Sequence, residues 1–274
     1  MSIRPARAVL PLLLSLLSLP ASASVIPTPG ESAVGSITLR IKAGDCAGAV
    51  DWLKDGLKAE YREVELLAGT MYDLGLCVRR DWSRAVGFYA KAYAAGLPEG
   101  AERLAAGYAD PKNGPDAAAA LWWAMKGRAF HDPGCGVAPD AANDPDRFVA
   151  ALSGWTPQRL AYCNYVVGVM STISSELRYP ELAADFALGG DFTLHFLPAV
   201  PRVEVQKGEA REYAVLGFID GDALRDRSSK AVARSIEKTI KEVTDRALKR
   251  YPQPAGIPAN SWADMKYTFE IVYK

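Results

Sequence analysis

The chain has 274 residues, 49% of them hydrophobic, and no formal net charge at neutral pH. A chain of this length and composition can bury one or two ordinary hydrophobic cores, which excludes a disordered protein. The balance of 32 basic and 32 acidic residues argues against nucleic acid as a partner.

The first 23 residues have the three parts of a secretory signal peptide. Arg4 and Arg7 form a basic start, an apolar run follows from Ala8 to Leu19, and Ala21-Ser22-Ala23 is a small-residue cleavage site. The alternative is a membrane anchor, but the run is shorter than the ~20 apolar residues that span a bilayer. We therefore expect a periplasmic protein with no stable membrane span after cleavage, and a flexible segment at residues 24–39.

All four cysteines follow the expected cleavage site; they are Cys46, Cys77, Cys135 and Cys163. An even number of cysteines in an oxidising compartment favours disulfides, and three pairings are possible. The alternative for Cys135 is a metal site with His131 and Asp132. The chain has only two histidines and no second cluster with ligand spacing, so we expect no metal site.

Small and aromatic residues recur in blocks about 35 residues apart. The blocks are Ala49–Leu53, Ala85–Tyr89 and Ala119–Trp123, offset by 36 and then by 34 residues. Each block follows an acidic residue, namely Asp45, Asp81 or Asp116. A period near 35 with two helices per unit is typical of an α-solenoid.

The repeat resembles the Sel-one-like family, which is related to tetratricopeptide repeats. The matching residues of the first full unit are Gly69, Tyr72, Gly75, Val78, Asp81, Arg84, Ala85, Tyr89, Lys91 and Ala92. Departures are Ala68 for leucine, Cys77 for glycine and Phe88 for tryptophan. The resemblance covers residues 40–130 and implies stacked helix pairs with aromatic residues packed between them, which are Phe88, Tyr89, Trp122 and Trp123.

Helix pairs of this kind indicate both a binding surface and a disulfide pairing. Solenoids bind peptides along their inner helices, so Tyr72 and Tyr108 are candidate partner contacts, although packing would also explain them. Cys46 starts one expected helix and Cys77 ends the next, antiparallel helix. We therefore expect a Cys46–Cys77 disulfide and, from the remaining two cysteines, Cys135–Cys163, each with Cα atoms less than about 7 Å apart.

The segment 131–178 is expected to form a loop, from Asp132 to Pro145, and a connecting helix that starts at Thr156-Pro157. Beyond it three strands are expected: apolar residues alternate with polar ones at Phe192–Phe196 and in the C-terminal segment Tyr267–Tyr273, and Tyr213–Ile219 is a compact apolar strand. The segment Ser228–Arg250 is an amphipathic helix with its apolar stripe on one side. One helix facing a small sheet predicts a two-layer α+β domain at residues 179–274.

This second half is similar to the C-terminal domain of TonB-type energy transducers. The similar segments are Tyr179–Ala183, Gly190–Phe196, Ser228-Ser229 and Tyr267–Val272. The segment Pro201–Arg211 reads as an insertion, and Lys230 replaces a glycine of the family. A transducer also needs a membrane helix and a long proline-rich spacer, neither of which the sequence contains. The resemblance therefore implies the fold and not energy transduction.

No motif indicates an enzyme. Ser235-Ile236-Glu237-Lys238 fits the S-x-x-K motif of penicillin-recognising enzymes, but the companion motifs are missing. Both motif residues also lie off the apolar stripe of their helix. His195 is expected on the outer face of a strand and His131 in a loop, so we expect no catalytic and no cofactor-binding residues.

These observations favour a periplasmic adaptor that binds proteins of the cell envelope. The solenoid would offer a groove and the second domain a sheet edge. The alternatives are an enzyme that acts on the cell wall or on β-lactams, a component of TonB-like energy transduction, and a structural piece of a larger envelope assembly.

Overall fold

The computed structural model describes residues 27–127, 130–180, 182–183, 188–212 and 222–269. Its helices are α1 (Pro29–Lys42), α2 (Cys46–Lys58), α3 (Arg62–Leu74), α4 (Trp82–Ala94), α5 (Pro98–Ala109), α6 (Ala117–Ala124), α7 (Pro145–Ser153), α8 (Pro157–Glu176) and α10 (Asp222–Arg250), with a short 3-10 turn at Pro111–Asn113. Its strands are β1 (Phe130–His131), β2 (Leu188–Leu197), β3 (Arg202–Glu212) and β4 (Ala263–Phe269). The expected signal peptide and the expected strand at Tyr213–Ile219 lie outside the described residues.

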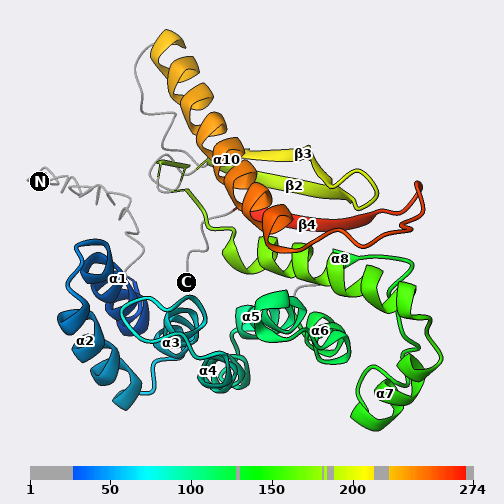
Figure 1. Ribbon diagram of the computed structural model, residues 1–274. Helices are drawn as coiled ribbons and strands as arrows, with labels where there is room; N and C mark the ends of the chain where they lie inside the picture. The colour runs from blue at the N-terminus through cyan, green and yellow to red at the C-terminus, as the bar shows by residue number, and fades with distance from the viewer. Residues whose placement is uncertain (1–26, 128–129, 181, 184–187, 213–221, 270–274) are drawn as a thin grey trace, which may run out of the picture.

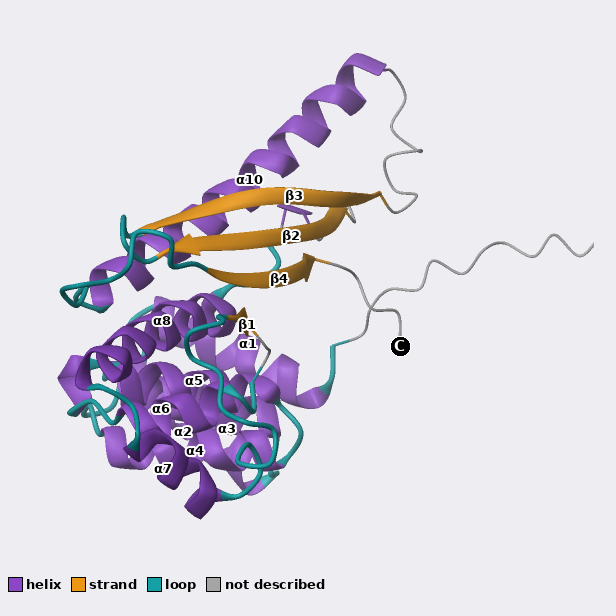
Figure 2. Ribbon diagram, turned by 90° about the vertical axis from the view of Figure 1, so that its right-hand side faces the viewer, coloured by secondary structure: helices purple, strands orange, loops and turns teal. Residues whose placement is uncertain are grey.

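The molecule has a helical part and a small antiparallel sheet, so it is a mixed α and β protein. Helices α1 to α6 follow one another along one side, and α8 lies between them and the sheet (Figures 1 and 2). One hydrophobic cluster extends from Ala105 in α5 through α8 and α10 to Phe269 in β4. The two parts therefore share a core.

Three aspartates cap the helices α2, α4 and α6 in the same way. The carboxylates of Asp45, Asp81 and Asp116 accept a hydrogen bond from the backbone N–H three residues later, at 2.9, 3.1 and 3.0 Å. The backbone N–H of Asp81 also donates to the carbonyl of Tyr72 (2.9 Å), and that of Asp116 donates to the carbonyl of Tyr108 (2.8 Å). Each cap thus ties its helix to the end of a preceding one.

The caps correct the spacing of the third block. Ala49, Ala85 and Ala120 each lie four residues after a cap, and all three are fully buried. The offset to the third unit is therefore 35 residues instead of 34. Trp123, and not Trp122, therefore has the helix position of Phe88. The cap determines where each helix starts, whereas the comparison of the sequence blocks had matched their pairs of adjacent aromatic residues.

Glycines let aromatic rings pack against the helix backbones. A methyl group on Gly69 would overlap the ring of Tyr89, and one on Gly107 would overlap the ring of Trp82. The Tyr89 side chain is fully buried, and burial raises the pKa of its hydroxyl to about 12. Phe88, Trp122 and Trp123 are half-buried against the hydrophobic clusters. All four aromatic residues therefore pack within the helical part.

The segment expected to be flexible, residues 24–39, contains most of α1. Thr28 and Glu31 form a capping box, with hydrogen bonds of 3.1 and 2.7 Å between the side chain of each and the backbone N–H of the other. Ile37 is fully buried in a cluster with residues of α2 and α3. Residues 29–39 are therefore ordered as a packed helix, of which Pro29 is the first residue.

The structure contains both disulfides in the expected pairing. The Cα atoms of Cys46 and Cys77 are 4.9 Å apart, and those of Cys135 and Cys163 are 5.5 Å apart. Cys77 has a φ angle of 58°, in the left-handed region that favours glycine, which is the residue that the repeat pattern has at this position. The first disulfide joins the start of α2 to the turn after α3.

The segment 131–178 is more than a loop and a connecting helix. Helix α7 lies between the expected loop and α8, and β1 begins just before the segment. From Cys163 to Ser175 every residue of α8 except Asn164 is buried. Helix α8 is thus a central element of the core and not only a connection, because α5, α6 and α10 all pack against it.

The sheet has the order β1-β4-β2-β3, and all its neighbours are antiparallel. Most of the segment Pro201–Arg211, which the resemblance treats as an insertion, forms β3 and pairs with β2. Phe192, Leu194 and Phe196 are buried on the face that α8 and α10 cover. The strand signal of β3 was weak because only Val203 and Val205 alternate there with polar residues.

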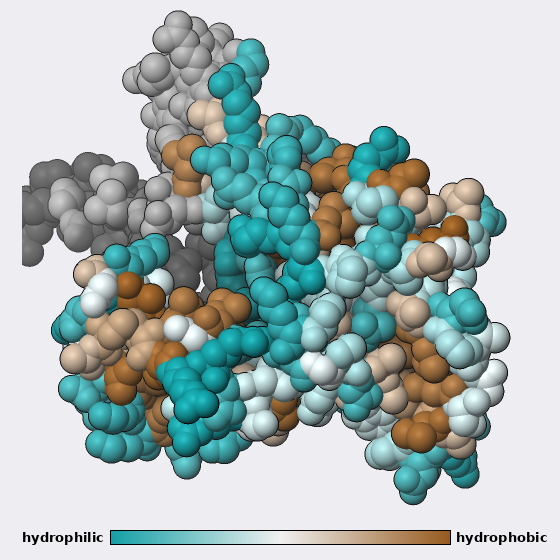
Figure 3. Space-filling view, in the orientation of Figure 1, coloured by the Kyte–Doolittle hydropathy of each residue, from teal (hydrophilic) through white to brown (hydrophobic). Residues whose placement is uncertain are grey.

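Helix α10 begins at Asp222, six residues before the expected start. Ile236, Ile240, Val243 and Ala247 are buried against the core, as its apolar stripe predicted. The opposite side of the helix is hydrophilic and faces the viewer in Figure 3. Among the helices of the described part of the chain, none combines the length and the hydropathy that a bilayer span needs.

Candidate functional site

The two tyrosines expected to contact a partner lie in aromatic contacts between helices. The ring of Tyr72 stacks on Phe88, with centroids 5.6 Å apart and an angle of 11° between the rings. The ring of Tyr108 meets Trp82 edge to face at 5.4 Å. Both tyrosines are half-buried, and burial raises the pKa of Tyr108. This placement is what packing between helices requires.

The inner surface beside α3 and α5 holds a cleft of about 580 Å³ that is lined mainly by charged side chains. Six charged residues of α3, α5 and its C-cap, α8 and α10 meet there; we call them the junction cluster, and they are Asp73, Arg103, Asp110, Glu176, Arg246 and Arg250. Arg250 lies 2.7 Å from Asp110 and 3.7 Å from Asp73. An open groove along these inner helices was expected, and α8 and α10 form one wall of the cleft at this place.

The junction cluster balances three acidic against three basic side chains. Glu176 accepts from Arg103 at 3.3 Å and from Arg246 at 3.2 Å. Burial raises the pKa of Asp73, which is only 3% exposed, and the guanidinium groups of Arg250 and Arg103 oppose this shift. A buried cluster of this kind holds elements together only while each charge keeps its partner. We therefore assign it a structural role.

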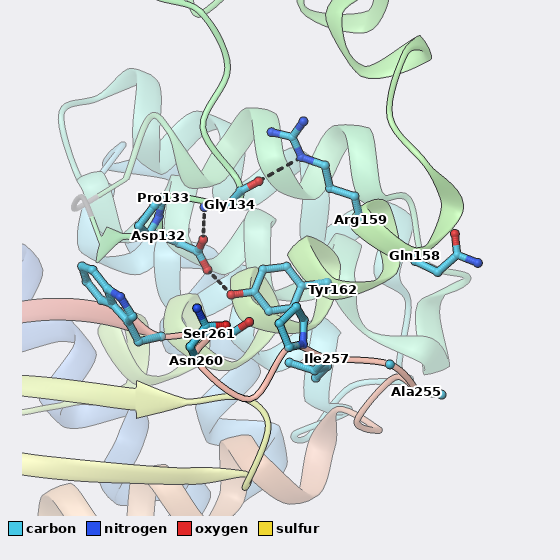
Figure 4. Close-up of a pocket in the computed structure, with 13 residues that line it drawn as sticks. Asp132, Pro133, Gly134, Gln158, Arg159, Tyr162, Ala255, Ile257, Asn260 and Ser261 are labelled. Atoms are coloured by element: carbon cyan, nitrogen blue, oxygen red, sulfur yellow. Dashed lines mark hydrogen bonds between the residues drawn. The ribbon is translucent and has the colours of Figure 1, made fainter.

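A second region, with an open pocket of about 670 Å³, lies at the other end of α8. Three segments far apart in the sequence meet there: the loop Asp132–Gly134, the first turns of α8, and the loop 255–262 between α10 and β4 (Figure 4). We call it the α8 pocket. Pockets of this size suit small organic ligands.

Asp132 and Tyr162 form the polar floor of the α8 pocket. The Tyr162 hydroxyl donates to Asp132 Oδ2 at 2.8 Å, and the backbone N–H of Gly134 donates to Asp132 Oδ1 at 2.6 Å (Figure 4). Burial raises the pKa of Asp132, while these two hydrogen bonds act against the shift. Burial and the nearby carboxylate both raise the pKa of Tyr162. The tyrosine therefore stays protonated at neutral pH.

The loop that carries Asp132 is held from two further sides. Arg159 Nε donates to the carbonyl of Gly134 at 2.9 Å, and Arg159 also donates to the carbonyl of Gly136 at 3.4 Å. Its guanidinium stacks on the ring of Trp155 at 3.6 Å. The Cys135–Cys163 disulfide fixes the same loop to α8. The pocket is thus pre-shaped by covalent and polar contacts.

The α8 pocket lacks the arrangement that activates a nucleophile. The hydroxyl of Ser261 is hydrogen-bonded to Tyr162, which in turn donates to Asp132. A serine nucleophile must give its proton to a base. The protonated phenol of Tyr162 cannot serve as that base. The arrangement suits the binding of a ligand better than proton transfer.

The two histidines of the chain lie in one row across the sheet, with Asp264 between them. His131 and His195 are the cross-strand neighbours of Asp264, one on each side, and His195 Nδ1 is hydrogen-bonded to Asp264. The indole of Trp262 contacts both imidazoles, at centroid distances of 5.5 and 6.0 Å. Cys135 is in a disulfide, so it offers no thiolate beside His131. In the described ranges, no group of three or more potential ligands has metal-binding geometry.

The S-x-x-K motif lies on the hydrophilic side of α10. The side chain of Lys238 is 76% exposed and pairs with Glu242 at 3.8 Å. Ser235 is half-buried. A catalytic lysine of this type needs to be desolvated, which this one is not.

The sequence did not point to the residues of the α8 pocket as a group. Asp132, Tyr162 and Trp262 are separated by 30 and by 100 positions, so no motif joins them. The turn at Asp132-Pro133-Gly134 was the one local signal, and it indicated only a loop. Comparison of the chain with protein-family models, with curated proteins and with solved structures finds no match.

Proposed function

We propose that this protein is an exported, non-catalytic adaptor of the cell envelope that binds a protein partner along the open edge of β3. In this proposal residues 40–130 form a Sel-one-like solenoid and residues 179–274 a domain of the TonB C-terminal type. The recurring caps of Asp45, Asp81 and Asp116 support the first assignment. The antiparallel hairpin followed by a long helix and a third long strand supports the second.

Export is supported by the chemistry of the cysteines. All four are paired in two disulfides, which persist in oxidising compartments such as the periplasm. The basic, apolar and small-residue segments of residues 1–23 agree with this location.

The observation that carries the binding proposal is the one-sided pairing of β3. This 11-residue strand pairs with β2 from Arg202 to Glu212, and no described strand pairs with its other side. An edge of this length can accept a strand from another protein through main-chain hydrogen bonds. The cleft along the inner helices is the less suitable site because the charged side chains that line it are already paired within the junction cluster.

A cleft beside β3 would give such a strand its specificity. The cleft has a volume of about 380 Å³, lies between β3 and α10, and is lined by Val203, Val205 and Leu248 together with charged residues of α10. Val205 is 40% exposed, although its neighbour in register, Leu194, is fully buried. We expect a partner strand with apolar side chains on the face that meets α10.

The test is capture of a partner with the full mature chain, followed by binding of the purified partner to two variants. Val205→Asp places a charge in the cleft, whereas Val200→Asp places the same charge on the 58% exposed valine of the turn before β3. We expect Val205→Asp to weaken binding by about tenfold or more, which corresponds to at least ~1.4 kcal/mol, and Val200→Asp to leave it unchanged. Equal binding by both variants would contradict the β3 edge as the binding site.

The enzyme alternative receives no support from a particular site. Lys238 is exposed, so the S-x-x-K motif has no desolvated lysine. In the α8 pocket the phenol of Tyr162 donates to Asp132 and cannot act as a base. Turnover of a β-lactam or a wall fragment by the purified mature chain would overturn the non-catalytic proposal.

A further inference from the structure

The α8 pocket is separate from the β3 edge and has its own chemistry. It is lined by one acidic and one basic residue, Asp132 and Arg159. Both are already engaged. Asp132 accepts from Tyr162 and Gly134, and Arg159 donates to the carbonyls of the disulfide loop. The two opposite charges cancel and both groups already make hydrogen bonds within the protein, so the pocket has no net charge to attract an ion, which favours an uncharged ligand.

The groups that remain for a ligand are neutral and polar. The exposed amides of Gln158 and Asn260 and the half-buried Ser261 line the opening (Figure 4). Neither amide makes a side-chain hydrogen bond to any other residue that the structure describes. An amide both donates and accepts, so two amides and a hydroxyl match a ligand whose neighbouring groups also do both.

Aromatic rings supply the rest of the wall. Trp262 and Tyr162 both line the pocket, and the indole is kept in place by the imidazole of His195, stacked at 6.0 Å with 26° between the rings. The face of an aromatic ring carries the negative part of its quadrupole, so it attracts C–H groups that bear a partial positive charge. The C–H groups of a pyranose ring are of this kind.

We propose that the α8 pocket binds an uncharged carbohydrate, with a sugar ring against Trp262 and its hydroxyl groups hydrogen-bonded to Asn260 and Gln158. A volume of about 670 Å³ accommodates a short oligosaccharide. An anionic ligand would be repelled by the carboxylate of Asp132, and the guanidinium of Arg159 is directed to the carbonyls of Gly134 and Gly136. A wholly apolar ligand would leave the two amides without partners.

One wall of the pocket is held in place before a ligand arrives. The Cys135–Cys163 disulfide, the Tyr162–Asp132 hydrogen bond and the contacts of Arg159 fix the loop on one side. Pre-organisation reduces the entropy lost on binding, which matters for sugars because each of their hydrogen bonds replaces one to water.

The test is isothermal titration of the full mature chain with chitotetraose, maltotetraose and cellotetraose, with inorganic phosphate and tetra-alanine as probes of other chemistry. We expect saturable binding of at least one saccharide. Trp262→Ala and Asn260→Ala should each weaken it by about tenfold or more. Trp52→Ala, which removes a 44% exposed indole on α2, should leave it unchanged.

Asn260 is on an exposed loop, so its variant remains informative even when Trp262→Ala fails to fold. Absence of saturable saccharide binding, or binding that neither Asn260→Ala nor Trp262→Ala weakens, overturns the proposal. So does binding of phosphate or tetra-alanine in place of a saccharide. The Val205→Asp variant should bind the saccharide like the wild-type chain, so a failure of the adaptor proposal is distinguishable from a failure of this one.

Discussion

Arg250, in the last turn of α10, places its Nε 2.7 Å from a carboxylate oxygen of Asp110, a residue 140 positions earlier in the chain. The same guanidinium lies 3.7 Å from the buried carboxylate of Asp73. One side chain of α10 thus compensates two acidic groups of the helical part. The halves of the protein are joined by charge as well as by their shared core.

Replacing Arg250 by methionine should destabilise the fold strongly. The variant would leave the carboxylates of Asp73 and Asp110 buried without their partner, and removal of one partner from a buried pair typically costs about 3–5 kcal/mol. Urea unfolding at neutral pH would measure the loss. Lys249→Met, at the neighbouring exposed position, is the matched control and should change the free energy of unfolding by less than about 0.5 kcal/mol.

The loss of folding stability caused by Arg250→Met should be smaller at acid pH than at neutral pH. Burial raises the pKa of Asp73, so this carboxyl becomes neutral at a higher pH than an exposed one and no longer needs the guanidinium. An equally large loss at neutral pH and at about pH 4 would contradict the charge-pair explanation.

Two glycines in helix interiors should respond to alanine in opposite ways. A methyl group on Gly168 of α8 would lie 2.6 Å from two ring carbons of Tyr251, so Gly168→Ala should cost about 1–3 kcal/mol. Gly87 of α4 has no heavy atom within 4 Å of that position, so Gly87→Ala should stabilise by up to about 1 kcal/mol through helix propensity. Thermal unfolding of both variants would compare them, and destabilisation by Gly87→Ala would show that this packing description is wrong.

The two disulfides should contribute similar amounts to stability. They close loops of 31 and 28 residues, for which the chain-entropy model gives about 3.5 kcal/mol each. The double variant Cys46→Ala/Cys77→Ala should therefore unfold at a lower urea concentration than the wild type. A reductant should destabilise this variant further, through the second disulfide. Wild-type unfolding that does not respond to reductant would contradict the prediction.

Asp132 should make the protein less stable as the pH rises. Burial raises the folded-state pKa of this carboxyl above its unfolded value, so the folded state binds the proton more tightly. The resulting stabilisation is complete below the unfolded pKa and is lost as the pH rises through the folded pKa. The free energy of unfolding of Asp132→Asn minus that of the wild type should therefore increase between about pH 3 and about pH 6. A difference that is constant over this range would contradict the assignment.

The sequence by itself determined the features that depend on neighbouring residues. The aspartate caps, the alanine and aromatic spacing and the apolar stripe of α10 are local patterns, and the helices that they predicted are present. The Cys46–Cys77 pairing also followed from local order, because antiparallel helices bring the start of one beside the end of the next. The boundaries of the helices were predicted less accurately. Most of α1 lies in the segment expected to be flexible, and α10 starts six residues before its expected start.

The tertiary structure decided everything that depends on residues far apart in the chain. Strand β3 is polar and mostly exposed where its side chains are described, so only its pairing with β2 identifies it as part of the sheet. The burial of Asp73 against Arg250, and the meeting of Asp132, Tyr162 and Trp262 in one pocket, arise because α8 and α10 pack across the helical part. Such contacts leave no periodic pattern, since each side chain is placed by packing and not by the spacing of its neighbours.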